Sequence, residues 1–311
     1  MSTIATTSQP AAFSPLKRLI QQHPLVAYFV LAFVGSWLTE LPVVLDKNGI
    51  GLLPYTLPFL PFFLLMPFTG PTLSAFMVTA VTDGKAGVWQ LLRRYVQWRV
   101  GVRWYLLALL GAPVVLLLSA SVVLGAAPLS ALVEHWPLIF SSYLPSVLLI
   151  TLVLGGPLGE EPGWRGFALP RLQQQYGALR GSLILGTLHA LWHLPLFLVV
   201  GAYAPFTLPG FVAFALVVML NAFIFTWVFN NTRGSLLIVI LLHSAFNAGS
   251  HFVEEQLIPT AQLSNWLPVI TYGVCALLII VFTRGHLGYR SEQASQLVEI
   301  PGPAETPLAR G

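Results

Sequence analysis

An uncharged stretch occupies residues 104–127, with the sequence WYLLALLGAPVVLLLSASVVLGAA. A helix of about 20 apolar residues crosses the roughly 30 Å hydrocarbon core of a bilayer. This stretch is therefore long enough to span a membrane. The alternation of apolar and polar residues that is typical of membrane β-barrel strands is absent, so we expect a helix.

The whole chain shares this apolar character. Its 311 residues include 15 basic and 11 acidic side chains, so 8% are charged, against about 25% in soluble domains. Hydrophobic residues make up 56% of the chain, and the mean hydropathy is +0.78. A soluble protein must cover its surface with polar groups, so this composition excludes a soluble enzyme and a disordered chain. Cys275 is the only cysteine, which excludes an intramolecular disulfide framework.

Further apolar runs of similar length occur along the chain. We therefore predict an all-α membrane protein, a bundle of about eight transmembrane helices. The run at 57–82 contains four prolines, so one kinked helix and two broken pieces both remain open. The predicted spans are 24–45, 57–82, 104–127, 137–158, 182–201, 208–229, 234–252 and 264–283.

The predicted membrane domain covers residues 23–284, with a functional core at about 137–252. Residues 1–22 are polar and are predicted to form a cytoplasmic N-terminal segment. Residues 285–311 are polar and rich in proline and glycine, and we predict a disordered tail. No small-residue cleavage site follows the first span, so we expect it to be retained rather than removed as a signal peptide.

Basic residues next to the spans predict the orientation of the bundle. With eight spans, 14 of the 15 Lys and Arg residues fall on one side, and only Lys47 falls on the other. Basic residues favour the cytoplasmic side, so both termini are predicted to be cytoplasmic. The chain is thus expected to be an integral, multi-pass membrane protein, in the plasma membrane if its source is bacterial.

Polar residues inside or beside spans are costly and usually mark function. The first such cluster is Glu160-Glu161-Pro-Gly-Trp-Arg165, after the predicted fourth span. Burial raises the pKa of a carboxyl group, so one glutamate could serve as a general base. Arg165 follows Glu161 by four residues, a helical spacing that favours pairing. An ordinary charged loop is the alternative.

Two more clusters lie within predicted spans. His189 and His193 are four residues apart in one span, a spacing that metal ligands often share. His243 and Asn247 are four residues apart in another, where two donors could stabilise an oxyanion. Hydrogen bonds between helices would explain either pair equally well. A carboxylate, histidines and an amide that converge within one bundle are the components of a water-activating hydrolase.

These three motifs, in this order and in separate spans, resemble the CPBP family of intramembrane proteases. Glu160-Glu161-x-x-x-Arg165 is followed by His193 in a Trp-His-Leu-Pro context, and then by His243-x-x-x-Asn247. That family includes the CAAX prenyl endopeptidases, which remove the last three residues of prenylated proteins, and bacterial relatives linked to bacteriocin self-immunity. The resemblance is strong over about 150–250 and implies that the core at 137–252 is a protease core.

The resemblance also implies roles for individual residues. Glu160 and His193 would hold and activate the attacking water, and His243 and Asn247 would bind the oxyanion. Glu161 and Arg165 would support them as a pair. The family pattern has Phe four residues before its second-motif histidine, and this chain has His189 there. That residue is expected to be either a packing substitution or an additional polar group, and not a catalytic one.

The sequence is compatible with a metal-dependent and with a metal-free site. Glu160, His193 and His243 would be reasonable zinc ligands with one coordination position open, and without a metal the same residues would serve a glutamate-type protease. No His-Glu-x-x-His motif is present.

We therefore predict an endopeptidase that cleaves a membrane-anchored peptide or protein, of which a prenylated CAAX protein is one candidate. Its expected partners are this substrate and the lipid bilayer, and no nucleic acid. The alternative is a non-catalytic transporter or scaffold that uses the same polar residues as a relay or as contacts between helices.

Overall fold

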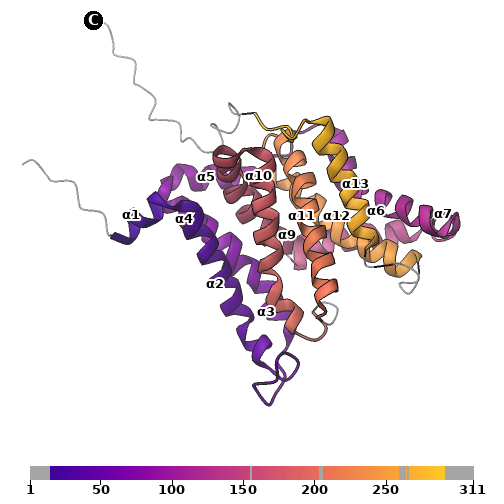
Figure 1. Cartoon of the computed structure of the whole chain (residues 1–311), viewed down its shortest axis with the longest axis horizontal. Coiled ribbons are helices and arrows are strands. Elements are labelled where there is room, and N and C mark those ends of the chain that lie inside the picture. The colour runs from indigo at the N-terminus through magenta and orange to yellow at the C-terminus, as the bar shows by residue number, and fades with distance from the viewer. Residues whose placement is uncertain (1–14, 155, 203–205, 259–263, 265, 291–311) are drawn as a thin grey trace, which may run out of the picture.

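The computed structural model describes residues 15–154, 156–202, 206–258, 264 and 266–290. Every regular element in these ranges is a helix (Figure 1). The all-α membrane bundle is confirmed. The helices, α or π unless marked 3-10, are α1 (Pro15–Gln22), α2 (Pro24–Leu45), α3 (Phe59–Pro67), η1 (Phe68–Thr72), α4 (Leu73–Thr82), α5 (Gly84–Tyr95), α6 (Val102–Leu124), α7 (Ala127–Glu134), η2 (Ile139–Tyr143), α8 (Leu144–Leu149), η3 (Ile150–Leu154), α9 (Gly156–Glu161), η4 (Pro162–Ala168), α10 (Leu169–Trp192), the 3-10 helix η5 (Leu194–Leu198), α11 (Leu208–Asn231), α12 (Leu236–His251), η6 (Phe252–Leu257) and α13 (Leu267–Phe282).

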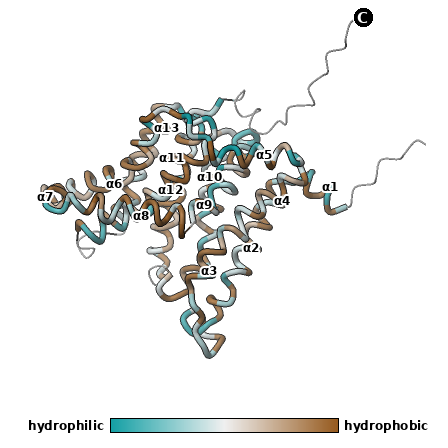
Figure 2. The backbone as a smooth tube through the Cα atoms, turned by 180° about the vertical axis from the view of Figure 1, so that it is seen from behind, coloured by the Kyte–Doolittle hydropathy of each residue, from teal (hydrophilic) through white to brown (hydrophobic). Residues whose placement is uncertain are grey.

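Six helical stretches in the described residues are long and apolar enough to cross a membrane. A seventh is obtained if α7 and the helical stretch 139–154, which are bent by 78° to each other, form one span. Helix α13 is apolar but only 16 residues long. An integral, multi-pass protein is therefore confirmed, whereas the count of eight and the cytoplasmic termini stay predictions. Apolar residues run along most of these helices (Figure 2).

The proline-rich run predicted at 57–82 is one helical stretch, Phe59–Thr82. Its middle turn, η1, is a π-helix that contains Pro71. A proline cannot donate the usual backbone hydrogen bond, and a π-turn is a common local adjustment to such a break.

The connection between the predicted spans 137–158 and 182–201 is helical. Residues 156–176 continue through α9, η4 and the start of α10, and 159–170 are all buried. The chain then turns at Gly177, whose φ of 77° and ψ of 168° are open essentially to glycine alone. We call the two arms, 156–176 and 178–193, the Gly177 hairpin.

The register of the Gly177 hairpin determines which residues face each other. A Cβ added to Gly181 would lie 3.0 Å from the carbonyl carbon of Leu172, so the two arms touch at this point. Twelve residues further from the turn along each arm lie Glu160 and His193. Two antiparallel helices keep their register over such a distance, about 18 Å at 1.5 Å per residue. The hairpin therefore brings the first and second sequence motifs together.

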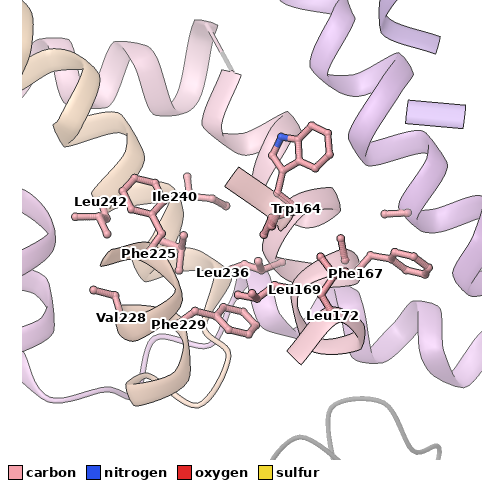
Figure 3. Close-up of a cluster of buried hydrophobic side chains, with 14 of the residues drawn as sticks. Trp164, Phe167, Leu169, Leu172, Phe225, Val228, Phe229, Leu236, Ile240 and Leu242 are labelled. Atoms are coloured by element: carbon pink, nitrogen blue, oxygen red, sulfur yellow. The ribbon is translucent and has the colours of Figure 1, made fainter. Parts of the chain in front are cut away.

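A buried apolar core surrounds the first arm of the hairpin (Figure 3). Trp164 and Phe167 from η4 pack in this core with Phe225 and Phe229 of α11 and Leu236 of α12. The second arm lies along α11, where a Cβ on Gly186 would be 2.8 Å from the side chain of Ala222. Small residues permit this close approach of two membrane helices.

The basic connections of the bundle meet at one end. Arg171 of α10 pairs with Asp83, between α4 and α5, at 2.6 Å. The side-chain amide of Gln97 donates to the carbonyls of Thr232 and Arg233 at 3.2 and 3.1 Å. Connections that were predicted to share one side of the membrane are thus in contact, although the side itself is not established by these contacts.

The ends of the chain differ in part from the prediction. Helix α1 lies within the segment predicted to be polar and cytoplasmic, whereas residues 1–14 lie outside the described residues. Within the predicted tail, Leu287 is fully buried and its carbonyl accepts a hydrogen bond from Asn230 at 2.9 Å. The ordered chain therefore continues past 285, and 291–311 lie outside the described residues.

Candidate active site

The two adjacent glutamates are buried in the bundle. Glu160 is 7% exposed and Glu161 is 0% exposed, which excludes the ordinary charged loop that the sequence left open. Helix α9 carries both, and its carbonyl at Gly159 accepts a hydrogen bond from the Thr72 hydroxyl at 2.5 Å. A Cβ on Gly159 would lie 3.0 Å from the Pro67 side chain. Glycine here allows α9 to pack directly against η1 and the end of α3.

Glu161 is the centre of a buried polar group with Arg165 and His243. Its Oε1 accepts from Nη1 of Arg165 at 2.9 Å and lies 2.7 Å from Nδ1 of His243. Arg165 is 1% exposed, and its guanidinium carbon lies 4.8 Å from the centre of the Phe225 ring. An arginine and a carboxylate buried together compensate each other's charge. Glu161 thus joins the first sequence motif to the third.

Glu160 faces the second arm of the hairpin instead. Its Oε2 lies 2.9 Å from Nε2 of His189, and both side chains are buried. His193 lies at the C-terminal end of α10, one turn beyond His189, where its Nδ1 donates to the His189 carbonyl at 2.9 Å. Since a carbonyl oxygen only accepts, this bond places the proton of the neutral His193 ring on Nδ1. Nε2 of the neutral ring then carries the lone pair.

The third motif lies on α12, and its two residues differ in how exposed their side chains are. His243 is partly buried, and its ring centre is 6.4 Å from that of His189. Asn247 is one turn further along α12, and it is exposed. The structure therefore brings Glu160, His189, His193 and His243 together, whereas Asn247 lies at the surface of the bundle.

The structure also identifies one residue that the sequence interpretation set aside. His189 was expected to be a packing substitution or an additional polar group, and its imidazole is in direct contact with Glu160. The signal was present in the sequence, because His189 and His193 have the i, i+4 spacing of residues that share a helix face. The resembling pattern has Phe at this position, which favours a packing role for the residue there.

The candidate metal ligands differ from the predicted set. Within the described residues, one atom each from Glu160, His189 and His193 lies within 4.8 Å of the others, and all three residues are buried. His243 was predicted in this set, but it is not part of this group and bonds to Glu161. The predicted triad with His243 stays a prediction.

Several buried polar atoms around the site have no hydrogen-bonding partner among the described protein atoms. They are Oε2 of Glu161, Nδ1 of His189, Nε1 of Trp164 and of Trp192, and the hydroxyl of Tyr28. Buried polar groups rarely remain without a partner, since each costs about 1–3 kcal/mol. This part of the bundle is therefore suited to bind a polar ligand or water.

Comparison with known proteins places these residues in one matched segment. Residues 142–249 match the family described as type II CAAX prenyl endopeptidase Rce1-like. The chain is also similar to CAAX prenyl protease 2 of Methanococcus maripaludis, with 26% identity over 149 residues. That alignment covers 47% of this chain and 53% of the relative, so it spans about half the length of the curated protein.

Proposed function

We propose that the chain is an intramembrane endopeptidase, because residues 142–249 match the family described as type II CAAX prenyl endopeptidase Rce1-like. It hydrolyses a peptide bond of a membrane-anchored protein or peptide. The observation that carries the proposal is the buried group of Glu160, His189 and His193. Oε2 of Glu160 lies 2.9 Å from Nε2 of His189, and one ligand atom of each residue lies within 4.8 Å of the others. A buried carboxylate beside oriented imidazoles is suited to activate water.

Glu160 is the proposed general base. Its carboxylate takes a proton from the attacking water, and Nε2 of His193 accepts a hydrogen bond that orients this water. The bond from His193 Nδ1 to the His189 carbonyl supports this role, because it holds the ring in one tautomer and one orientation. The proton on Glu160 then passes to the leaving amine.

His243 and Asn247 are the proposed oxyanion donors. Since Nδ1 of His243 faces the carboxylate of Glu161, its Nε2 can donate to an oxyanion when the ring is protonated. Glu161 holds the ring in this orientation through Nδ1, and Arg165 compensates the charge of Glu161. Asn247 shares the α12 face of His243, and its exposure supports a role at the entrance where substrate arrives.

A prenylated CAAX protein is the proposed substrate class, since the matched family and the archaeal relative carry that activity in their names. The test uses the purified full chain in detergent and two fluorogenic peptides of one sequence, one farnesylated at the CAAX cysteine and one not. Cleavage of the farnesylated peptide alone is expected, and equal cleavage of both would show that prenylation is not recognised.

Point variants test the residues. Glu160→Gln and His193→Ala should each lower kcat about 10²–10⁴-fold, the usual contribution of general acid–base catalysis. His251→Ala is the matched control, because His251 is an exposed histidine on α12 that pairs with Glu255. Equal rates in Glu160→Gln and His251→Ala would show the assignment to be wrong. Solute uptake into liposomes that requires Glu160, without peptide release, would favour the transporter alternative.

A further inference from the structure

His189 distinguishes this chain from the pattern it resembles, because that pattern has Phe at the same position. Its imidazole is 4% exposed and contacts Glu160 through Nε2. Glu160, His189 and His193 form the only group of three or more metal-binding side chains found at ligand spacing in the described ranges. One carboxylate and two imidazoles are the donor set of several catalytic zinc sites.

We propose that Glu160, His189 and His193 bind a single zinc ion. The inference rests on the proposed function and modifies it. With zinc bound, Oε2 of Glu160 and Nε2 of His193 would be metal ligands, and the metal would supply the water activation that the proposal above gives to these two atoms. Three protein ligands leave one position of a tetrahedral zinc open, as in catalytic rather than structural sites. A zinc ion bound there would supply a Lewis acid beside the scissile bond.

The orientation of the rings fits this site. His193 donates from Nδ1 to a backbone carbonyl, which is the way metal-binding histidines are usually held, and this leaves Nε2 as the ligand atom. Nε2 of His189 and Oε2 of Glu160 are 2.9 Å apart. Two ligand atoms on a tetrahedral zinc lie roughly 3.3 Å apart. These two atoms therefore need to move apart by only a few tenths of an ångström when the metal binds.

The charge around Glu160 also favours a cation. The guanidinium of Arg165 pairs with the neighbouring Glu161. Among the ion pairs of the described part of the chain, Glu160 is paired with His189 alone. A buried carboxylate is costly unless it is paired or coordinates a metal. A divalent cation held by two neutral imidazoles compensates this carboxylate.

His189 rather than His243 is therefore the third ligand. The Nδ1 of His243 lies 2.7 Å from Glu161, on the other glutamate of the pair. This difference gives a direct test, because replacing His189 should weaken zinc binding and replacing His243 should not. His189→Phe restores the residue of the related pattern and removes a ligand, whereas His243→Ala leaves all three proposed ligands in place.

The experiment measures metal binding by itself. The purified full chain is stripped with a chelator, titrated with zinc, and assayed for bound zinc by mass spectrometry; cobalt absorption reports the coordination geometry. One zinc per chain is expected for the wild type and for His243→Ala. His189→Phe should weaken binding by more than about 100-fold, since loss of groups that only support a ligand already costs 10–100-fold. His189→Gln, which keeps a polar side chain, should behave in the same way.

Two results would overturn the proposal. One is a wild-type chain that takes up no zinc while its unfolding profile shows it to be folded. The other is zinc affinity in folded His189→Phe or His189→Gln equal to that of the wild type. The outcome is separate from the proposed function: cleavage that needs Glu160 but no zinc refutes the metal site alone, and zinc binding without cleavage refutes the peptidase alone.

Discussion

Replacing Arg165 by Met should strongly destabilise the bundle. The guanidinium is 1% exposed, and its Nη1 lies 2.9 Å from a glutamate that is 0% exposed. Met keeps much of the side-chain volume over Phe225 but leaves Glu161 without its cation. Removing one partner of a buried ion pair costs about 3–5 kcal/mol, because the other charge remains buried and uncompensated. The free energy of unfolding should fall by that amount.

The assay is unfolding by SDS in mixed micelles, followed by tryptophan fluorescence, to which the buried Trp164 and Trp192 contribute. Arg290→Met is the matched control, because Arg290 is exposed and should change stability by less than about 0.5 kcal/mol. The double variant with Glu161→Leu removes both charges. It should be more stable than Arg165→Met alone, since no isolated charge is left.

Two results would refute this reasoning. If Arg165→Met costs no more than Arg290→Met, the pair does not compensate a buried charge. If the double variant loses the sum of the two single losses, Glu161 and Arg165 act independently, although they are in contact.

Three further predictions concern residues that stabilise the folded chain outside the candidate site. Gly177→Ala should lower the free energy of unfolding by about 1–3 kcal/mol, because Gly177 has a positive φ. Gly111→Ala in α6 is the control and should be neutral or stabilising, since the added Cβ would have its nearest neighbour at 3.8 Å. Equal midpoints of SDS unfolding for the two variants would contradict this. Asn230→Ala should lose about 1–3 kcal/mol in the same assay, because it leaves the buried Gln173 amide without its reciprocal bonds of 3.1 and 2.7 Å; an unchanged midpoint would be the contrary result. The pKa of Asp46 is held below its usual value by hydrogen bonds from backbone N–H groups, first that of Leu57 and then those of Asn48 and Gly49. The folded state therefore gains stability above the usual pKa, about 4, and loses it as the pH falls through the lowered value. Proteolysis of residues 46–58, which connect α2 and α3, should rise in acid for the wild type, and Asp46→Asn should abolish that pH dependence; a parallel rise in both would contradict it.

Much of the fold follows from local properties of the sequence. Charge density and the length of apolar runs predict membrane helices, because a bilayer requires about 20 apolar residues and internally satisfied backbone groups. The span predicted at 208–229 is part of α11, and that at 104–127 overlaps α6. The sequence left open an ordinary charged loop around Glu160 and Glu161. Both are buried, because His189 of α10 and His243 of α12 pack against them.

The sequence by itself also determined which polar residues share a face of one helix. The spacing of four residues in Glu161–Arg165 and in His189–His193 is a property of any helix, and it needs no tertiary contact. The order of the three motifs was enough to indicate a peptidase family.

Only the tertiary structure decided which motif meets which glutamate. His189 reaches Glu160 across 29 residues, and His243 reaches Glu161 across 82. Two adjacent glutamates on a helix point in directions about 100° apart, so each can face a different neighbour. Which neighbour lies there depends on the turn at Gly177 and on the packing of α10 and α12 around η4, and no local pattern contains that information.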